Sequence, residues 1–211
     1  MNNRKFNNWN AILFGLLGVC LVLYFRTSGS AGCLSALLAK RFSGYAYDAN
    51  KLVTDEQLHT IMQAGQRAPS SYNEQPWRFI ICKKDTHAQA YNKVLNALVE
   101  FNQKWAQNAP VLIVIIADTK SAHMPVNTWA AYDTGAAAFS MVLAAAELGL
   151  MTHQMGGFNP EMIRAAFNIS SDYMPIAVMA LGWPDATRQE KPKNERRPLE
   201  KNFFMGTWQA S

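Results

Sequence analysis

Four separated segments of the chain carry side chains suited to binding a ligand. They are residues 40–48 (KRFSGYAYD), 68–79 (APSSYNEQPWRF), 148–167 (LGLMTHQMGGFNPEMIRAAF) and 196–208 (RRPLEKNFFMGTW). Together they supply arginines, serines, asparagines and an adjacent pair of glycines. Fixed cations and hydroxyl donors are the groups that bind a phosphate, and glycine lets the backbone approach a flat ring closely. These residue types could therefore hold an anion and allow close contact with the backbone.

Alternating helix and strand signals indicate how these segments are positioned. A capping box at Thr54–Gln57 begins a helix that we expect to reach about Arg67. The run Val111–Ala117 is almost continuously apolar and β-branched, as expected for a strand covered on both faces. The other predicted elements are helices over 34–41, from a cap at 86–89 to about 105, over 128–148 and from 159 onward, and strands over 78–82 and 176–181. This pattern predicts an α+β domain whose central sheet, mixed or antiparallel, is covered by helices.

The predicted helix over 128–148 has an unusual composition. Its stretch TGAAAFSMVLAAAELG is small and apolar nearly all the way round. A helix of this kind must be buried on several sides, which is hard to arrange in one small domain and easy at a subunit interface. The composition therefore favours a homodimer.

The overall composition fits one globular domain. A length of 211 residues, with 49% hydrophobic and 17% charged residues, excludes a disordered chain. The net charge of +5 could suit an anionic ligand, but the basic residues form no stripe with interleaved aromatics, so we expect no nucleic-acid partner. The three cysteines and four isolated histidines have no metal-ligand spacing, so we predict no metal site and no disulfide framework.

The first 32 residues differ in character from the rest and are predicted to be a leader to a domain over 33–211. Arg4 and Lys5 precede an apolar run over 11–25 (AILFGLLGVCLVLYF). Three interpretations remain open: a short signal anchor, a cleaved export signal, or a segment added by a misplaced start. Because the positive residues precede the run and only Arg26 closely follows it, we favour a membrane-anchoring transmembrane helix. If the leader is not an anchor, we expect a cytoplasmic protein.

In this order and at these intervals, the four segments resemble the FMN-dependent nitroreductase family. The resemblance extends from about Ser35 to Trp208, and the loop with two serines, Asn73 and Gln75-Pro76-Trp77 is its most specific part. It implies a nitroreductase-like fold in an intertwined homodimer, with FMN bound at the interface and both subunits contributing.

The resemblance assigns the FMN phosphate to Arg41, Ser43 and Arg197. Arg196 is a weaker candidate, because adjacent side chains need not point the same way. The alternative for each cation is an ordinary surface arginine. The chain departs from many relatives at Tyr45, where they carry a second basic residue two positions after the serine. This departure would make phosphate binding depend more on Arg197.

Ser70, Ser71 and Asn73 would hydrogen-bond the ribityl chain and the flavin ring, although a capping turn would favour the same residue types. Asn102 and Lys104 fall where the family often places polar groups against the pyrimidine edge of the ring. A lysine or amide at this edge would stabilise the anionic reduced flavin. A solvated helix end is an equally good interpretation of these two residues.

Gly156 and Gly157 directly precede the helix signal at 159. In the family context, a backbone N–H here would hydrogen-bond flavin N5, the atom that receives hydride. The alternative is a plain loop that needs a positive φ angle.

The resemblance implies ping-pong chemistry in which NADH or NADPH reduces the flavin, and a nitroaromatic, quinone or similar small acceptor reoxidises it. No side chain is predicted to be catalytic, because the cofactor carries the chemistry. Two alternatives remain: a flavin-dependent dehydrogenase or dehalogenase with a narrow substrate, and a non-catalytic, membrane-tethered FMN-binding protein. A Rossmann-type NAD enzyme has no support, because no GxGxxG motif follows a strand.

Overall fold

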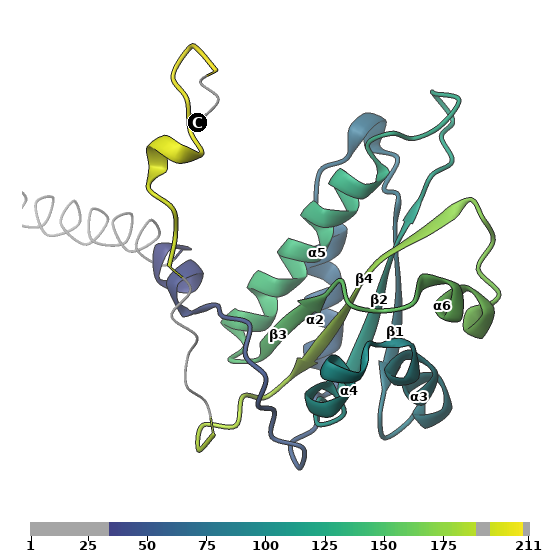
Figure 1. Cartoon of the computed structure of the whole chain (residues 1–211), viewed down its shortest axis with the longest axis vertical. Helices are drawn as coiled ribbons and strands as arrows, with labels where there is room; N and C mark the ends of the chain where they lie inside the picture. Colours follow the sequence, from purple (N-terminus) through teal and green to yellow (C-terminus); the bar gives the residue numbers. More distant parts are fainter. Residues whose placement is uncertain (1–33, 189–194, 209–211) are drawn as a thin grey trace, which may run out of the picture.

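The computed structural model describes residues 34–188 and 195–208. At its centre is an antiparallel sheet with the strand order β1-β2-β4-β3 (Figure 1). Its strands are β1 (Trp77–Lys83), β2 (Val111–Asp118), β3 (Met151–Met155) and β4 (Tyr173–Gly182). The sheet is therefore the antiparallel form of the predicted one, and the α+β prediction is confirmed.

Helices cover both faces of this sheet (Figure 1). On one face lie α2 (Asp55–Gln66) and α5 (Ala130–Glu147), and on the other lie α3 (Ala88–Ala97), α4 (Glu100–Ala106) and α6 (Pro160–Phe167). Residues 34–40 are also helical, and two short 3-10 helices span Ser71–Asn73 and Leu199–Lys201. Strand β2 is buried along its whole length, because Ile113 and Ile115 face the first layer while Leu112 and Val114 face the second.

Local capping explains where two of the helices begin. The Thr54 hydroxyl accepts from the Gln57 N–H at 3.2 Å, and the Gln57 side chain accepts from the Thr54 N–H at 3.0 Å. This is the predicted capping box. The Asn159 side chain accepts from the backbone N–H of Glu161 and of Met162 at the start of α6. Both predicted helix starts are therefore confirmed.

The predicted continuous helix from 86–89 to about 105 is wrong. Leu98 and Val99 are extended, with ψ angles of 152° and 149°, and they separate α3 from α4. The break allows a long-range pairing, in which Val99 N–H donates to the Gly157 carbonyl at 3.0 Å and Asn159 N–H donates to the Ala97 carbonyl at 2.7 Å. These tertiary hydrogen bonds replace the helical ones at this point.

The predicted transmembrane anchor must also be corrected. No helix within residues 34–188 and 195–208 is both long and apolar enough to cross a membrane. The longest, α5, has 18 residues and includes the acidic side chains of Asp133 and Glu147, whereas a spanning helix needs about 20 apolar residues. The run over 11–25 that suggested the anchor lies outside the described residues.

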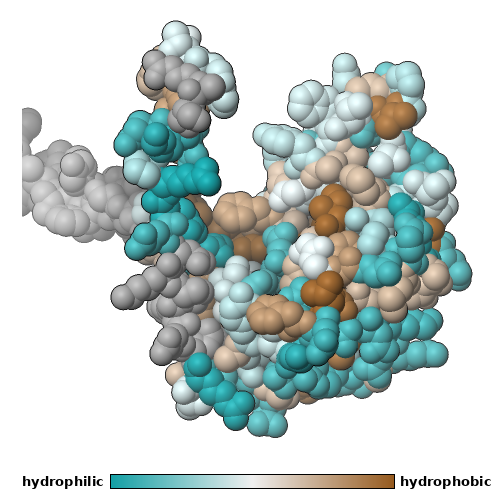
Figure 2. Space-filling view, viewed as in Figure 1, coloured by the Kyte–Doolittle hydropathy of each residue, from teal (hydrophilic) through white to brown (hydrophobic). Residues whose placement is uncertain are grey.

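The carboxyl-terminal residues 195–208 form an arm that extends away from the layered body (Figure 1). The arm exposes large apolar side chains, with Phe203 68%, Met205 96% and Trp208 79% accessible. Hydrophobic residues also reach the surface of the body, which the arm does not cover in this view (Figure 2). The described chain thus leaves apolar surface unburied on both the arm and the body.

Candidate functional site

The first predicted phosphate segment lies where the helix over 34–40 ends. Arg41 Nη1 donates to the Ser43 hydroxyl at 3.4 Å, so the two predicted ligands are neighbours. The next residue, Gly44, holds the segment against β3, because its carbonyl accepts from Nδ1 of His153 at 3.1 Å. This loop is therefore anchored to the edge strand of the sheet.

A cavity of about 440 Å³ opens beside this loop. Its polar lining comes from Arg41, Ser43, Thr152, Gln154 and Arg196, and its apolar wall from Leu38, Phe139 and Val142. None of the described residues that line it is acidic. Two guanidinium groups with hydroxyl and amide donors form a set that binds anions, and phosphate in particular. The residues present therefore fit the anionic end of the predicted cofactor.

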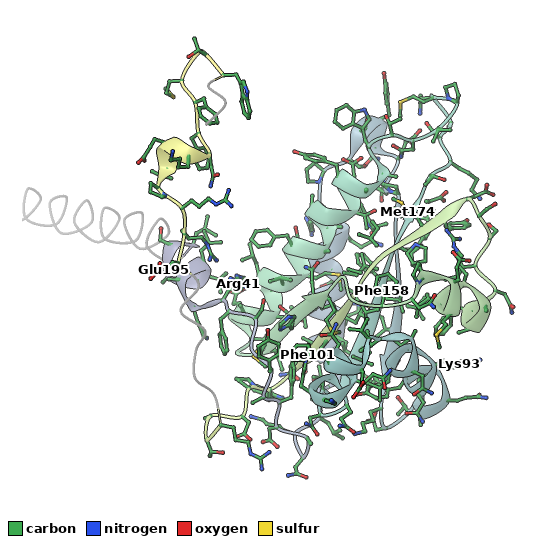
Figure 3. The ribbon with its side chains drawn as sticks, viewed as in Figure 1. Arg41, Lys93, Phe101, Phe158, Met174 and Glu195 are labelled. Atoms are coloured by element: carbon green, nitrogen blue, oxygen red, sulfur yellow. The ribbon has the colours of Figure 1, made fainter. Side chains whose placement is uncertain are left out.

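The arm contributes Arg196 to this cavity, and Arg197 is not among the lining residues. Figure 3 shows Arg41 and Glu195 at the same end of the molecule, where the arm passes the helix over 34–40. The sequence favoured Arg197 over Arg196 as a ligand of the phosphate, and of the two it is Arg196 that lines this cavity.

The planar end of the predicted site is built around the two glycines after β3. The Gly157 carbonyl accepts from Val99 N–H at 3.0 Å and from Asn102 Nδ2 at 3.1 Å. A Cβ atom added to Gly157 would lie 2.9 Å from Asn102 Nδ2 and 2.9 Å from Val99 Cγ2, whereas one added to Gly156 would meet nothing within 4 Å. Gly157 thus allows close packing, and Gly156 leaves its backbone open on one side.

Asn102 and Lys104, predicted at the same edge of a ring, have different surroundings. Asn102 is 9% accessible and packs against Gly157, so it belongs to this part of the molecule. The Lys104 side chain is 70% accessible and its Nζ lies 2.8 Å from a carboxylate oxygen of Glu100. Its charge is therefore directed to solvent and to an acidic neighbour.

The loop with Ser70, Ser71 and Asn73 is not among the residues that line this cavity. Ser71 N–H donates to the Asp133 carboxylate at 2.9 Å, which fixes the loop beside the first turn of α5. The cavity lies beside the second half of that helix, at Val142. Phe139 and Val142, which line the cavity, follow Asp133 by six and nine positions, or about 9 and 13 Å along the helix axis. The loop and the cavity therefore lie at different points along α5.

An aromatic cluster that the sequence did not indicate borders the same edge of β3. Tyr45 lies against Trp105 and His153, with ring centroids 5.2 and 5.0 Å apart, and against Phe101 at 5.9 Å. Burial lowers the pKa of His153 below its ordinary value, although the hydrogen bond to the Gly44 carbonyl acts in the opposite direction. Tyr45, which stands where many relatives carry a second basic residue, thus belongs to this aromatic cluster. No local sequence signal could have indicated the cluster, because the residues that form it are far apart in the sequence.

A model of the nitroreductase family matches residues 38–183 of the chain. A provisionally named NADH dehydrogenase/NAD(P)H nitroreductase of Archaeoglobus fulgidus is 30% identical over 156 residues, which are 72% of this chain and 85% of that protein. An NADH dehydrogenase of Thermus thermophilus is 26% identical over 181 residues, covering 71% and 84% of the two chains.

Solved structures agree with these sequence relatives. An oxidoreductase containing FMN has a TM-score of 0.75 and 31% identity, covering 83% of this chain and 92% of that chain. A nitroreductase family protein of Clostridium difficile has a TM-score of 0.68 at 24% identity, with 82% and 97% covered, which is a likeness of fold. The chain therefore belongs to the nitroreductase family and is an oxidoreductase. The resemblance noted in the sequence is confirmed.

Proposed function

We propose that the protein binds FMN, takes hydride from NADH or NADPH, and reduces a small aromatic or quinone-like acceptor such as a nitroaromatic. The observation that carries this proposal is the arrangement along β3. Thr152 and Gln154 line the basic cavity, and the open backbone of Gly156 follows directly after the strand. Four residues of extended chain span about 13 Å, so an elongated ligand can place its anionic and planar ends at these two points.

The residues of the chain would bind and orient the cofactor. Arg41 and Arg196 would hold the phosphate dianion, with hydroxyl help from Ser43. Asn102 would hold the Gly157 carbonyl, and so keep the glycine pair in place beside the ring. When bound, FMN would supply the hydride- and electron-transfer chemistry. We therefore assign no nucleophile or general acid to a side chain.

We propose further that the site is completed in a homodimer. The loop with Ser70, Ser71 and Asn73 lies about 9–13 Å along α5 from the cavity, and in a dimer it would serve the site of the other subunit. Helix α5 and the turn before it also expose Trp129 and Tyr132, which are 52% and 74% accessible. Exposed aromatic side chains such as these are enriched at protein interfaces.

A visible absorption spectrum of the purified full-length chain tests this function. We expect flavin bands, either as isolated or after FMN is added, which bleach with anaerobic NADH or NADPH and return with a quinone. Arg41→Ala should weaken FMN binding by about tenfold or more, because it removes a charged partner of the phosphate. The exposed Arg67→Ala is the matched control.

Sedimentation of the same sample reports its mass. Parallel lines in initial-velocity plots would support the ping-pong order. A colourless protein that does not take up added FMN would overturn the proposal, even though the fold would stand.

A further inference from the structure

The loop that contains Ser70, Ser71 and Asn73 is tied to a second loop by one buried carboxylate. Although Glu74 belongs to a surface loop, its side chain is only 8% accessible. The carboxylate is surrounded by donors from residues 121–127. These are the Ser121 hydroxyl, the Ala122 N–H at 3.0 Å, Nδ1 of His123 at 3.0 Å and Nδ2 of Asn127 at 2.9 Å. Such a set satisfies an ionised carboxylate, and these hydrogen bonds lower the Glu74 pKa.

The backbone on both sides of Glu74 is in an unusual conformation. Tyr72, Asn73 and Gln75 have φ angles of 50°, 55° and 48°, in the left-handed region that favours glycine. Asparagine tolerates this region, but tyrosine and glutamine do not prefer it. Residues in such conformations persist only where the surrounding structure holds them. Hydrogen bonds within the loop give part of this support, because the Ser70 hydroxyl accepts from Gln75 N–H at 3.0 Å and the Asn73 side chain accepts from Gln75 Nε2 at 3.2 Å.

Two carboxylates supply further support from opposite sides. Asp133 on α5 accepts from Ser71 N–H at 2.9 Å, before the left-handed residues. Glu74 makes its contacts between Asn73 and Gln75, and the Tyr72 ring stacks on His123 with centroids 4.8 Å apart and planes 8° apart. The loop over 119–128 thus holds both the carboxylate and the neighbouring aromatic ring.

We propose that Glu74 is a positioning residue, whose carboxylate fixes the 70–75 loop in the conformation that presents Ser70, Ser71 and Asn73 to the cofactor. That the loop contacts the cofactor rests on the proposed function. That Glu74 holds the loop rests only on the hydrogen bonds of its carboxylate. Glu74 acts through the backbone of the loop and has no contact with reacting atoms in this role.

Hydrogen exchange of the FMN-free, full-length protein tests the hold of Glu74 on the loop. Glu74→Gln keeps the size of the side chain but removes the charge and places an NH₂ group among donors. We expect exchange in residues 70–76 to rise by about tenfold or more, while β2 and β4 keep their protection. His123→Phe keeps a ring against Tyr72 and removes one donor, so it should have a smaller effect of the same kind. Glu56→Gln, on the exposed side of α2, is the matched control.

FMN titration of the same variants tests the link to the cofactor. We expect the FMN dissociation constant of Glu74→Gln to rise by about tenfold, and that of Glu56→Gln to stay at the wild-type value. Unchanged exchange in Glu74→Gln would overturn the proposal, as would faster exchange with unchanged FMN affinity. Wild-type protein that binds no FMN would instead overturn the proposed function, and faster exchange of its Glu74→Gln variant would still support the hold of Glu74 on the loop.

Discussion

The adjacent glycines after β3 offer a sharp test of the site geometry, because the structure assigns them different surroundings. In Gly157→Ala the new methyl group would lie 2.9 Å from both Asn102 Nδ2 and Val99 Cγ2. Overpacking of this kind costs about 1–3 kcal/mol, and losing the hydrogen bond from Asn102 to the Gly157 carbonyl costs about 0.5–1.5 kcal/mol. The free energy of unfolding should therefore fall by about 1.5–4.5 kcal/mol. That is less than the roughly 5–15 kcal/mol typical of a domain, so the variant should still fold.

Gly156→Ala is the matched control. Its Cβ would meet nothing within 4 Å, and its φ angle lies outside the left-handed region. The substitution should leave the stability within about 1 kcal/mol of wild type, or raise it, because alanine restricts the unfolded chain.

Urea unfolding of the FMN-free protein, followed by tryptophan fluorescence, measures both variants. With a denaturant slope of about 2 kcal/mol/M, the midpoint of Gly157→Ala should fall by about 1–2 M. FMN titration adds a second contrast, because the methyl group of Gly156→Ala would enter the open space assigned to the ring and weaken binding without loss of stability. Equal midpoints for the two variants would refute the packing described here.

Two further predictions concern titratable groups. Burial lowers the pKa of His153 below its ordinary value of 6.5, so below that pH the unfolded chain binds a proton that the folded chain does not. The stability present above about pH 6.5 should therefore be lost as the pH falls through the folded pKa of His153. In His153→Gln the urea midpoint should change less between about pH 7.5 and 5.5 than it does in the wild type. The same pH dependence in both proteins would contradict this. Burial raises the pKa of the Cys82 thiol to about 11. In a variant with Cys20 and Cys33 replaced by serine, a thiol reagent at about pH 8 should therefore label the folded protein at least tenfold more slowly than the denatured protein. Similar labelling rates would show that this thiol is accessible.

Much of the fold could be predicted because the signals are local. The capping box at Thr54, the cap at Asn159 and the apolar run of β2 each specify their element over a few residues. Strand β3 was not predicted, because its five residues, MTHQM, contain no run of apolar or β-branched side chains. Its pairing with β4 from Met151 to Met155 supplies the stabilisation that its composition lacks.

The site was less predictable, because its assembly depends on long-range contacts. The motif segments assigned both Arg41 and Ser43 to the phosphate, and the structure has their side chains hydrogen-bonded to each other. Which arginine of the arm lines the cavity with them depends on the path of the chain after Glu195, which the resemblance that favoured Arg197 does not specify. The position of Lys104 could have been predicted, because Glu100 precedes it by four residues and such pairs meet on a helix surface.

The departures from local rules lie in the segments that hold the proposed cofactor residues. The helix signal over 86–105 is broken at Val99, directly before Asn102 and against Gly157. The left-handed residues Tyr72 and Asn73 lie in the second cofactor loop. By contrast, α2 follows its capping signals and carries none of the proposed ligands. Natural proteins tend to keep local conflicts where function requires them. The break at Val99 and the left-handed residues at Tyr72 and Asn73 thus lie in segments to which the proposal assigns cofactor residues.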